Sequence, residues 1–445
     1  MADAVVSRAP ATVWATPERV AYGIAVLSGL IALWNAVTYP SAAGYDAASH
    51  REYADFLIQH HRLPYRDETP EYYSPPLYYL IAGTADWIGR HAGLGDPHKL
   101  GQLLNVPLVV GAVLLMVALA RLLWPSRPWL PVLAAGFVAL SPVLTRTAAM
   151  FNPEPADLFA SVLCAYLAAR ILAGRRYGAA SALGLGAVLG AAQMVRQFEL
   201  YTLAVVGLAY LSALWWRPAE RRALLRSLAV VLAAVALLAA PWYAYRAVHY
   251  ANPIFDRPHS TKPFFERRPA SFYLGSGLPG VFTHPYRPNL ANEVWPQTYA
   301  DVWGDWYGVF AWPAETAAKP SRAANAWLVL QDVVGVVPTL LAVGGWVALL
   351  VLSFRRRDSV LLLPALMPLA GLAGYLYFAI GYPTVDGDVI KPTFMLSTLW
   401  AWALCFAWAA GWAARRAPRL VVPALVAFAV IVLPFVLYRG AVGFF

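Results

Sequence analysis

Long apolar runs recur along the whole chain, and short polar or charged stretches separate them. A helix that crosses a bilayer needs roughly 20 predominantly apolar residues with few charges. Eleven runs fit this description, at about 20–39, 103–123, 129–145, 156–173, 178–195, 200–216, 225–244, 326–353, 359–380, 393–413 and 420–438. The pattern therefore predicts an all-α polytopic membrane protein with about eleven transmembrane helices.

One further apolar segment, residues 76–89, is predicted to lie along the membrane surface. It is too short for a span and contains Asp86. Short loops rich in Arg and Lys stay in the cytoplasm, and four such loops follow the runs that end near residues 173, 216, 353 and 413. All four fall on the cytoplasmic side only if the N-terminus is cytoplasmic and 76–89 does not cross. The segment is then an interfacial helix.

This topology divides the chain into four regions and places most acids outside. We expect a cytoplasmic N-terminus (1–19), a transmembrane core (20–244) that includes the outer segment 40–102, a large outer (periplasmic) loop that forms a small subdomain (245–325), and C-terminal transmembrane helices (326–445). Only four of the 24 acidic residues fall on the cytoplasmic side: Asp3, Glu18, Glu220 and Asp358. Acid chemistry is therefore expected at the outer face.

Composition agrees with a membrane protein and excludes several other classes. Hydrophobic residues make up 60% of the chain and charged residues 13%, against about 45–50% and about 25% in soluble domains. Cys164 and Cys405 lie inside apolar runs, which excludes a disulfide scaffold. The net charge of +10 does not indicate nucleic-acid binding, because the basic residues lie between apolar runs. Frequent Ala and Arg indicate a bacterial source, and hence an inner (plasma) membrane.

The first outer segment begins with an acidic residue and continues as a helix. Asp46 follows Gly44-Tyr45, and Tyr53, Phe56 and Leu57 recur at helical spacing on one face. An Asp in this position is equally consistent with a helix N-cap and with a catalytic residue. Both interpretations of Asp46 stay open at this point.

Acidic and histidine side chains cluster in this segment without a metal-binding motif. No spacing resembles paired CxxC or HExxH. We expect no metal or other cofactor to be required, although the cluster leaves room for a divalent cation. Its members are Asp46, His50, Glu52, Asp55, His60, His61, Asp67, Glu68 and Glu71.

The segment resembles the opening of the GT-C membrane glycosyltransferases. That opening has an acidic residue shortly after the first span, then a helix, then a short extended stretch, which here ends in Pro75-Pro76-Leu77-Tyr78-Tyr79. The resemblance is to bacterial members allied to the protein O-mannosyltransferases and lipid A aminoarabinose transferases. It implies that Asp46 is the catalytic base and that Pro75-Pro76-Leu77 opens a second interfacial helix.

Two later outer turns fit the same resemblance. Acids in Asn152-Pro153-Glu154-Pro155-Ala156-Asp157 would suit a helix N-terminus by its dipole alone. The family carries a second acidic residue in this turn, which Glu154 matches better than its substitute Asp157. In the next outer turn Arg196 and Glu199 could simply pair at the surface. Relatives have a basic residue there, which implies that Arg196 faces a phosphate.

A lysine leads into the tenth predicted span. Gly387-Asp388-Val389-Ile390-Lys391, followed by Phe394 and Leu396, resembles the family's Gly-x-x-Ile-Lys stretch. A lone Lys at a helix end usually extends to the lipid headgroups. The resemblance implies instead that Lys391 binds the phosphate of the sugar donor, as a compact point charge.

Aromatic residues and acids alternate near the end of the large outer loop, namely Trp295, Tyr299, Trp303, Trp306 and Tyr307 with Asp301 and Asp305. An interfacial aromatic belt is the default interpretation beside a span. A wall that faces a sugar or a lipid is the alternative, and Trp303-Gly304 with Gly308 resembles a Trp-Gly-x-x-x-Gly stretch of the family.

Together these motifs imply an inverting glycosyltransferase. A sugar would move from a polyprenyl-phosphate donor to a hydroxyl of an envelope acceptor (lipid, glycan or protein) on the outer face, without a nucleotide. Asp46 and Glu154 are the expected catalytic residues. The residues expected to bind substrate are Lys391, Arg196, Arg287, Arg246, Asp157, Glu71, Trp303, Tyr299, Asp305 and His50.

Two other functions remain as alternatives. A transporter or flippase of a lipid-linked or anionic substrate would carry functional charges midway through its spans, where this sequence has almost none. A ligase or polymerase that uses a polyprenyl-diphosphate saccharide would use an outer Arg or His cluster. His249, His259 and His284 are candidates for that cluster.

Overall fold

The computed structural model describes residues 16–250, 260–310, 320–384 and 389–438. Over these ranges the chain forms helices and no strand, so the predicted all-α fold is confirmed. Residues 1–15 of the expected cytoplasmic N-terminus, His259, Gly387 and Asp388 lie outside the described residues.

Nine helical segments of the described chain are long and apolar enough to cross a membrane. Several begin at a proline, whose fixed φ suits the first helical turn and whose missing amide is not needed there. The segments are α1 (Pro17–Thr38), α4 (Lys99–Leu103) with α5 (Asn105–Leu123), α8 (Glu154–Gly174), η1 (Gln197–Glu199) with α10 (Leu200–Trp216), η2 (Pro218–Glu220) with α11 (Arg221–His249), α15 (Arg322–Arg356), α16 (Leu362–Gly381), η4 (Pro392–Thr398) with α17 (Leu399–Arg416), and α18 (Pro418–Val432) with η5 (Leu433–Val436).

Two of the predicted spans differ from expectation. The run 129–145 forms two helices, α6 (Leu130–Ala139) and α7 (Pro142–Ala149), which are bent by 51° relative to each other. Pro142 has no amide hydrogen to continue the helical ladder, so α6 ends before it. The run 178–195 forms α9 (Ala179–Val195), which is apolar but only 17 residues long. The count of eleven is not confirmed: the described residues hold nine candidate spans, or ten with the bent pair.

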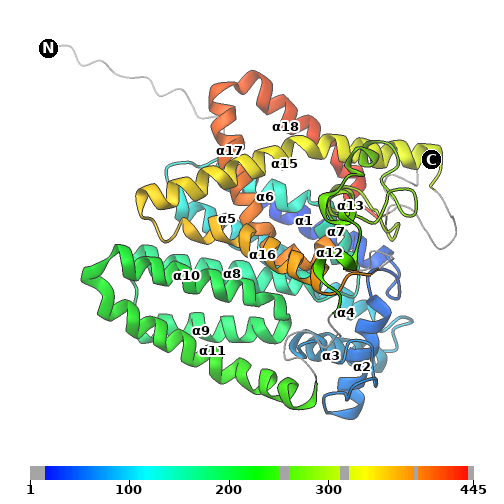
Figure 1. The fold of residues 1–445 in the computed structure, drawn as a ribbon, viewed down its shortest axis with the longest axis horizontal. Helices are drawn as coiled ribbons and strands as arrows, with labels where there is room; N and C mark the ends of the chain where they lie inside the picture. Colours follow the sequence, from blue (N-terminus) through cyan, green and yellow to red (C-terminus); the bar gives the residue numbers. More distant parts are fainter. Residues whose placement is uncertain (1–15, 251–259, 311–319, 385–388, 439–445) are drawn as a thin grey trace.

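Short helices gather at one end of the helical bundle. They are α2 (Ala47–His60), α3 (Leu77–His91), α12 (Phe264–Arg267), α13 (Ala270–Leu274), η3 (Leu278–Phe282) and α14 (Val294–Trp303). Figure 1 shows α8, α9, α10, α11 and α15 running across the picture, with α2, α3, α12 and α13 at its right-hand end.

The segment predicted at 76–89 forms α3, which is not among the candidate spans of the described chain. It packs on α2, where the ring centroids of Tyr53 and Tyr79 lie 4.5 Å apart. At Gly83 the two helices are so close that a Cβ atom would lie 2.7 Å from the carbonyl oxygen of Ala54. The two short helices therefore form one packed unit.

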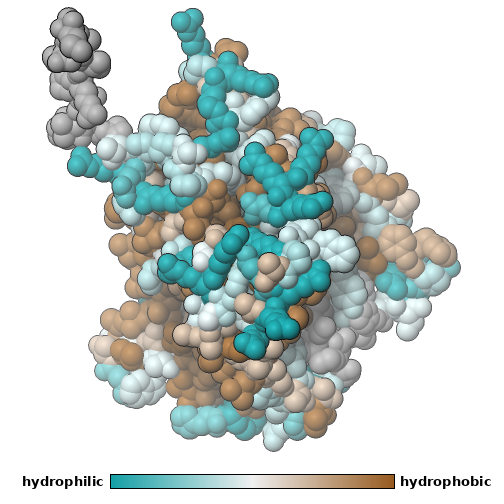
Figure 2. Space-filling view, turned by 90° about the vertical axis from the view of Figure 1, so that its left-hand side faces the viewer, coloured by the Kyte–Doolittle hydropathy of each residue, from teal (hydrophilic) through white to brown (hydrophobic). Residues whose placement is uncertain are grey.

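The four arginine-rich loops lie together at the opposite end, here called the basic end. Arg217 donates to the carbonyl oxygen of Leu172 at 2.7 Å and to Ser359 Oγ at 3.2 Å. Arg175 pairs with Glu220 at 3.2 Å. Figure 2 looks onto this end and shows hydrophilic side chains gathered between hydrophobic flanks. That the basic end faces the cytoplasm stays a prediction.

Two membrane helices approach closely at a glycine. A Cβ atom at Gly345 of α15 would overlap the carbonyl oxygen of Cys405 in α17. At the neighbouring Gly344 a Cβ atom would meet nothing within 4 Å. Small residues at such positions allow helix backbones to pack tightly in a membrane. The pair of adjacent glycines therefore offers a matched test of the contact between α15 and α17.

Gly345→Ala is expected to lower the free energy of unfolding by about 1–3 kcal/mol, because the added methyl group forces the two helices apart. Gly344→Ala is the control and should leave stability unchanged or raise it slightly, since Ala favours the helix over Gly. Unfolding of the detergent-solubilised variants measures both. Equal stability of the two variants would contradict the close approach of α15 and α17.

Candidate active site

Asp46 begins α2 but does not cap it. The residue has a left-handed backbone with φ of 52°, and its side chain makes no capping hydrogen bond. Its carboxylate instead accepts a hydrogen bond from Lys391 Nζ, with 2.8 Å between Nζ and Oδ2. The N-cap interpretation of Asp46 is therefore wrong, and the two residues singled out as base and phosphate ligand are direct neighbours.

Lys391 lies where the chain turns into η4. Its side chain is only 5% exposed, whereas that of Asp46 is 43% exposed. An ammonium group this deeply buried needs a negative partner close by. Lys391 therefore points to Asp46, and the alternative of a lysine extended to the lipid headgroups does not hold.

Glu154 and Arg196 form a second ion pair, and both are buried. Glu154 is the first residue of α8, and Arg196 lies between α9 and η1. Only Glu154 Oε1 contacts Arg196; the other oxygen, Oε2, has no hydrogen-bond partner among the described residues. A buried unpaired oxygen is costly, so Oε2 keeps an unused capacity to accept a hydrogen bond.

These groups line one polar pocket with an empty volume of about 610 Å³. The pocket brings together six of the predicted site residues, Asp46, His50, Glu71, Glu154, Arg196 and Lys391, from distant parts of the sequence. We call it the polar pocket. It lies at the end of the bundle opposite the basic end, because α8 carries Glu154 at one end and Gly174 at the other. Its other lining residues are Tyr45, Tyr73, Asn152, Gln197, Phe198, Phe378, Thr393 and Phe394.

His50 lies one helical turn after Asp46 and forms a hydrogen bond with Tyr79 Oη at 2.9 Å through Nδ1. Burial lowers the pKa of His50, so its imidazole is neutral at pH 7. Glu71 accepts a hydrogen bond from Ser74 Oγ at 2.7 Å. His50 thus serves the pocket as a neutral hydrogen-bonding group, and the positive charge comes from Lys391 and Arg196.

The structure places the other predicted substrate-binding residues outside the polar pocket. Asp157 is fully buried in α8, and Arg246 is buried beside the ring of Trp242. Arg287 is exposed, with its guanidinium group over the rings of Trp306 and Tyr307.

The aromatic segment also has a structural role. Asp305 accepts hydrogen bonds from the amides of Val309 and Phe310, which closes a turn. Trp303 is almost fully buried and donates to Thr339 Oγ1 at 2.9 Å. Tyr299 donates to the carbonyl oxygen of Asp332 at 2.7 Å. These bonds join α14 to α15, so the segment is a packed element more than an interfacial belt.

Sequence reasoning did not assign several lining residues to the site. Asn152 and Phe394 belong to the motifs that contain Glu154 and Lys391, and Gln197 directly follows Arg196. Their closeness in sequence to these predicted site residues is the signal that could have identified them. Tyr73 and Phe378 carry no such signal, because only the folded chain brings them to the pocket.

An apolar groove lies on the other side of η4, with an empty volume of about 1110 Å³. Pro392, Met395 and Leu396 line this groove, whereas Lys391, Thr393 and Phe394 line the polar pocket. The same short segment therefore forms a wall of both. Trp303 and Tyr299 lie on the groove side, together with Phe137, Trp295, Val302, Leu372 and Trp402.

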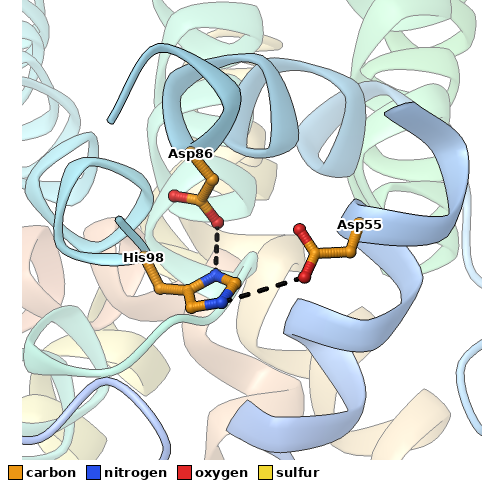
Figure 3. A group of neighbouring side chains, drawn as sticks. All are labelled: Asp55, Asp86 and His98. Carbon is orange, nitrogen blue, oxygen red and sulfur yellow. Dashed lines mark hydrogen bonds and ion pairs between the residues drawn. The ribbon is translucent and has the colours of Figure 1, made fainter. Parts of the chain in front are cut away.

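One group of side chains has the composition of a metal site. His98 lies between two carboxylates, with Nδ1 2.8 Å from Asp86 and Nε2 3.8 Å from Asp55 (Figure 3). Both acids have further partners: Arg90 pairs with Asp55 at 2.8 Å, and the Gly101 amide donates to Asp86 at 3.0 Å. These further contacts use the Oδ1 atoms of the two acids, and Arg90 already supplies a positive charge beside Asp55. The group fits a charge network between α2, α3 and α4 better than a metal site.

Removing one partner of the buried pair should be more costly than removing both. Arg196→Met is expected to lower the free energy of unfolding by about 3–5 kcal/mol, because Glu154 is left as an unpaired buried charge. Adding Glu154→Gln to that variant should restore much of the loss.

The exposed pair of Arg62 and Glu68 is the control for this cycle, since Arg62 is 40% exposed. Arg62→Met should cost at most about 1 kcal/mol. Chemical unfolding of the four proteins measures the differences. An Arg196→Met variant no less stable than Arg62→Met would contradict the buried pairing.

No protein-family model matches the chain, and a search of curated proteins finds no match. Solved structures do match. The apo form of the Archaeoglobus fulgidus oligosaccharyltransferase gives a TM-score of 0.55 at 15% identity, covering 95% of this chain and 55% of that chain. Its complex with Zn and sulfate gives a TM-score of 0.54 at 12% identity, covering 93% and 53%.

ArnT from Cupriavidus metallidurans bound to undecaprenyl phosphate also matches, with a TM-score of 0.39 at 15% identity, covering 91% of this chain and 80% of that chain. This chain spans about half the length of the oligosaccharyltransferase. At these identities the likeness to the oligosaccharyltransferase concerns the fold, and it agrees with the resemblance carried by the first outer segment. The chain has a GT-C-like membrane fold.

Proposed function

We propose that this protein is an inverting glycosyltransferase. It moves a sugar from a polyprenyl-phosphate donor to a hydroxyl of an envelope acceptor at the polar pocket, on the outer face of a bacterial inner membrane. The observation that carries the proposal is the polar pocket itself, where three acids and two cations meet beside an apolar groove. The GT-C-like fold supports glycosyl transfer as the reaction class.

The donor has a charged phosphate and a long apolar tail, and the two sides of η4 match these parts. The phosphate would bind Lys391, with Arg196 nearby in the same pocket. The tail would lie in the apolar groove, on the side of Met395 and Leu396. Burial of an apolar chain there contributes about 25 cal/mol per Å² of surface removed from water, while the phosphate fixes the position of the sugar.

The transfer itself is one displacement. The acceptor oxygen forms a bond to the anomeric carbon, and the bond from that carbon to the phosphate oxygen breaks, so polyprenyl phosphate leaves with the electron pair. Asp46 takes the proton of the attacking hydroxyl as a general base. Glu154 Oε2, which has no partner among the described residues, accepts a hydrogen bond that orients the acceptor. Attack opposite the leaving group inverts the anomeric centre.

Donor binding and base activation are linked through Lys391. The ammonium group holds Asp46 at 2.8 Å, and an arriving phosphate competes with that carboxylate for the same cation. When Lys391 turns to the phosphate, the Asp46 carboxylate is less strongly stabilised and becomes a stronger base. Lys391 and Arg196 also supply positive charge where the leaving phosphate gains negative charge. No step of this proposal passes through a metal ion.

Asp46→Asn is expected to lower the rate of polyprenyl-phosphate release by about 10²–10⁴-fold, the usual contribution of a general base. Donor affinity should stay close to that of the wild type. Asp67→Asn is the control, because Asp67 is an exposed acid in the same outer segment and also has a positive φ. The measurement is product release in lipid nanodiscs. Wild-type turnover by Asp46→Asn would remove the assigned base.

Lys391→Ala is expected to weaken the binding of polyprenyl phosphate about tenfold or more, because a charged hydrogen bond contributes about 1.5–3 kcal/mol. Equilibrium binding to the detergent-solubilised protein measures the effect. Lys262→Ala, an exposed lysine of the large loop, is the control. If the affinity of Lys391→Ala equals that of the control, Arg196 becomes the leading phosphate ligand.

A further inference from the structure

The backbone that presents Asp46 is strained. Asp46 has φ of 52°, and Gly44, two residues earlier, has φ of 107°. A non-glycine residue with positive φ is unfavourable and persists only when its surroundings hold it in place. Tyr45 lies between these two residues. The surroundings of Tyr45 therefore determine where the Asp46 carboxylate points.

Tyr45 is buried and held from several sides. Its hydroxyl group donates to the carboxylate of Asp301, with distances of 2.9 and 3.0 Å to the two oxygens. Its amide contacts Met150 Sδ at 3.3 Å, and its carbonyl oxygen accepts a hydrogen bond from Asn152 at 3.5 Å. Its ring meets that of Tyr307 edge-on at 5.3 Å. Backbone and side chain of Tyr45 are both fixed.

Asp301 is held in turn by Arg146, which comes from α7. The guanidinium group lies 3.2 Å from the Asp301 carboxylate and donates to the carbonyl oxygens of Asp301 and Gly304. It also lies over the Tyr45 ring, 5.6 Å from the centroid. Burial raises the pKa of Asp301 to about 6, with Arg146 acting in the opposite direction, so the carboxylate is mostly ionised at pH 7.

Tyr45, Asp301 and Arg146 thus form a buried network that joins α14 and α7 to the residue before the proposed base. Tyr45 lines the polar pocket, whereas Asp301 and Arg146 lie outside its lining. Among the described contacts, Tyr45 is the lining residue that Asp301 binds and that the Arg146 guanidinium covers. A shift of α14 would move Tyr45, and the strained Asp46 beside it.

We propose that Asp301 and Arg146 are positioning residues for the transfer: through the Tyr45 hydroxyl they hold the Asp46 carboxylate at the place where it takes the acceptor's proton. This inference rests on the proposed function. Proton transfer requires about 2.6–3.2 Å between the heavy atoms. A misplacement of about 1 Å can lower the rate about 10²-fold. How accurately the network positions the Asp46 carboxylate therefore affects the turnover rate.

Tyr45→Phe is the decisive variant, because it removes one oxygen and keeps the ring and the pair of Asp301 with Arg146. The turnover rate at saturating donor is expected to fall about 10–100-fold. The affinity for polyprenyl phosphate and the unfolding temperature should stay close to wild type. Asp301→Asn should lower turnover in the same way, but it also weakens the partner of Arg146, so its unfolding is measured in parallel.

Tyr39→Phe is the matched control. The Tyr39 hydroxyl donates to the carbonyl oxygen of Val309, which joins the end of α1 to the same outer region. This hydrogen bond does not involve Tyr45 or Asp46. A purely structural role of such bonds would give both Phe variants the same turnover. The positioning role predicts a fall in turnover, with unchanged donor affinity, for Tyr45→Phe alone.

Asp46→Asn in the same assay separates this inference from the proposed function. Inactive Asp46→Asn together with wild-type turnover by Tyr45→Phe would overturn the positioning role and leave the proposed base in place. Active Asp46→Asn would overturn both. A fall in donor affinity for Tyr45→Phe equal to its fall in turnover would also overturn the inference, because it would make Tyr45 a binding residue.

Discussion

The ion pair between Asp46 and Lys391 is the contact on which the polar pocket depends. It joins residues 345 positions apart, the first from the start of α2 and the second from the turn that leads into η4. The Lys391 side chain is buried, and a buried ammonium group needs an anionic partner to offset its lost hydration. Among the described residues Asp46 is such a partner. A donor phosphate offers the same charge, so the pair is suited to exchange one anion for the other.

The rest of the pocket repeats this balance of charge. Arg196 neutralises one oxygen of Glu154, and the other oxygen is buried without a hydrogen-bond partner among the described residues. Behind the pocket, Arg146 balances Asp301, which holds Tyr45. Apolar packing then separates the charged region from the groove on the far side of η4. The polar head and the apolar tail of a lipid-linked donor require such adjacent but separate environments.

Local patterns in the sequence predicted much of this arrangement. The apolar runs predicted the all-α fold. The basic loops and the short length of 76–89 predicted that this segment does not cross the membrane, and α3 is not among the candidate spans of the described chain. The resemblance of short motifs to those of the GT-C glycosyltransferases implied Asp46, Glu154, Arg196 and Lys391 as site residues, and the four share one pocket. These features depend on neighbouring residues, which is why a single sequence contains them.

Features that depend on distant partners were not accessible in the same way. The 51° bend between α6 and α7 reduces one expected span to two short helices. Asp157 lies only three residues after Glu154 but is buried within α8, away from the pocket lining. Arg287 has the right charge but lies over aromatic rings at the surface. The hydrogen bond from Tyr45 to Asp301 joins residues 256 positions apart, and no local sequence pattern predicts it.

Turnover of defined donors by the wild-type protein tests glycosyl transfer most directly. The protein in lipid nanodiscs would receive a panel of polyprenyl-phosphate sugars, with a membrane extract as the source of acceptor, and release of polyprenyl phosphate would be followed. We expect release with one donor of the panel, and a glycosylated product with the anomeric configuration opposite to that of the donor. No release with any donor, together with no saturable donor binding, would contradict the assignment as a transferase.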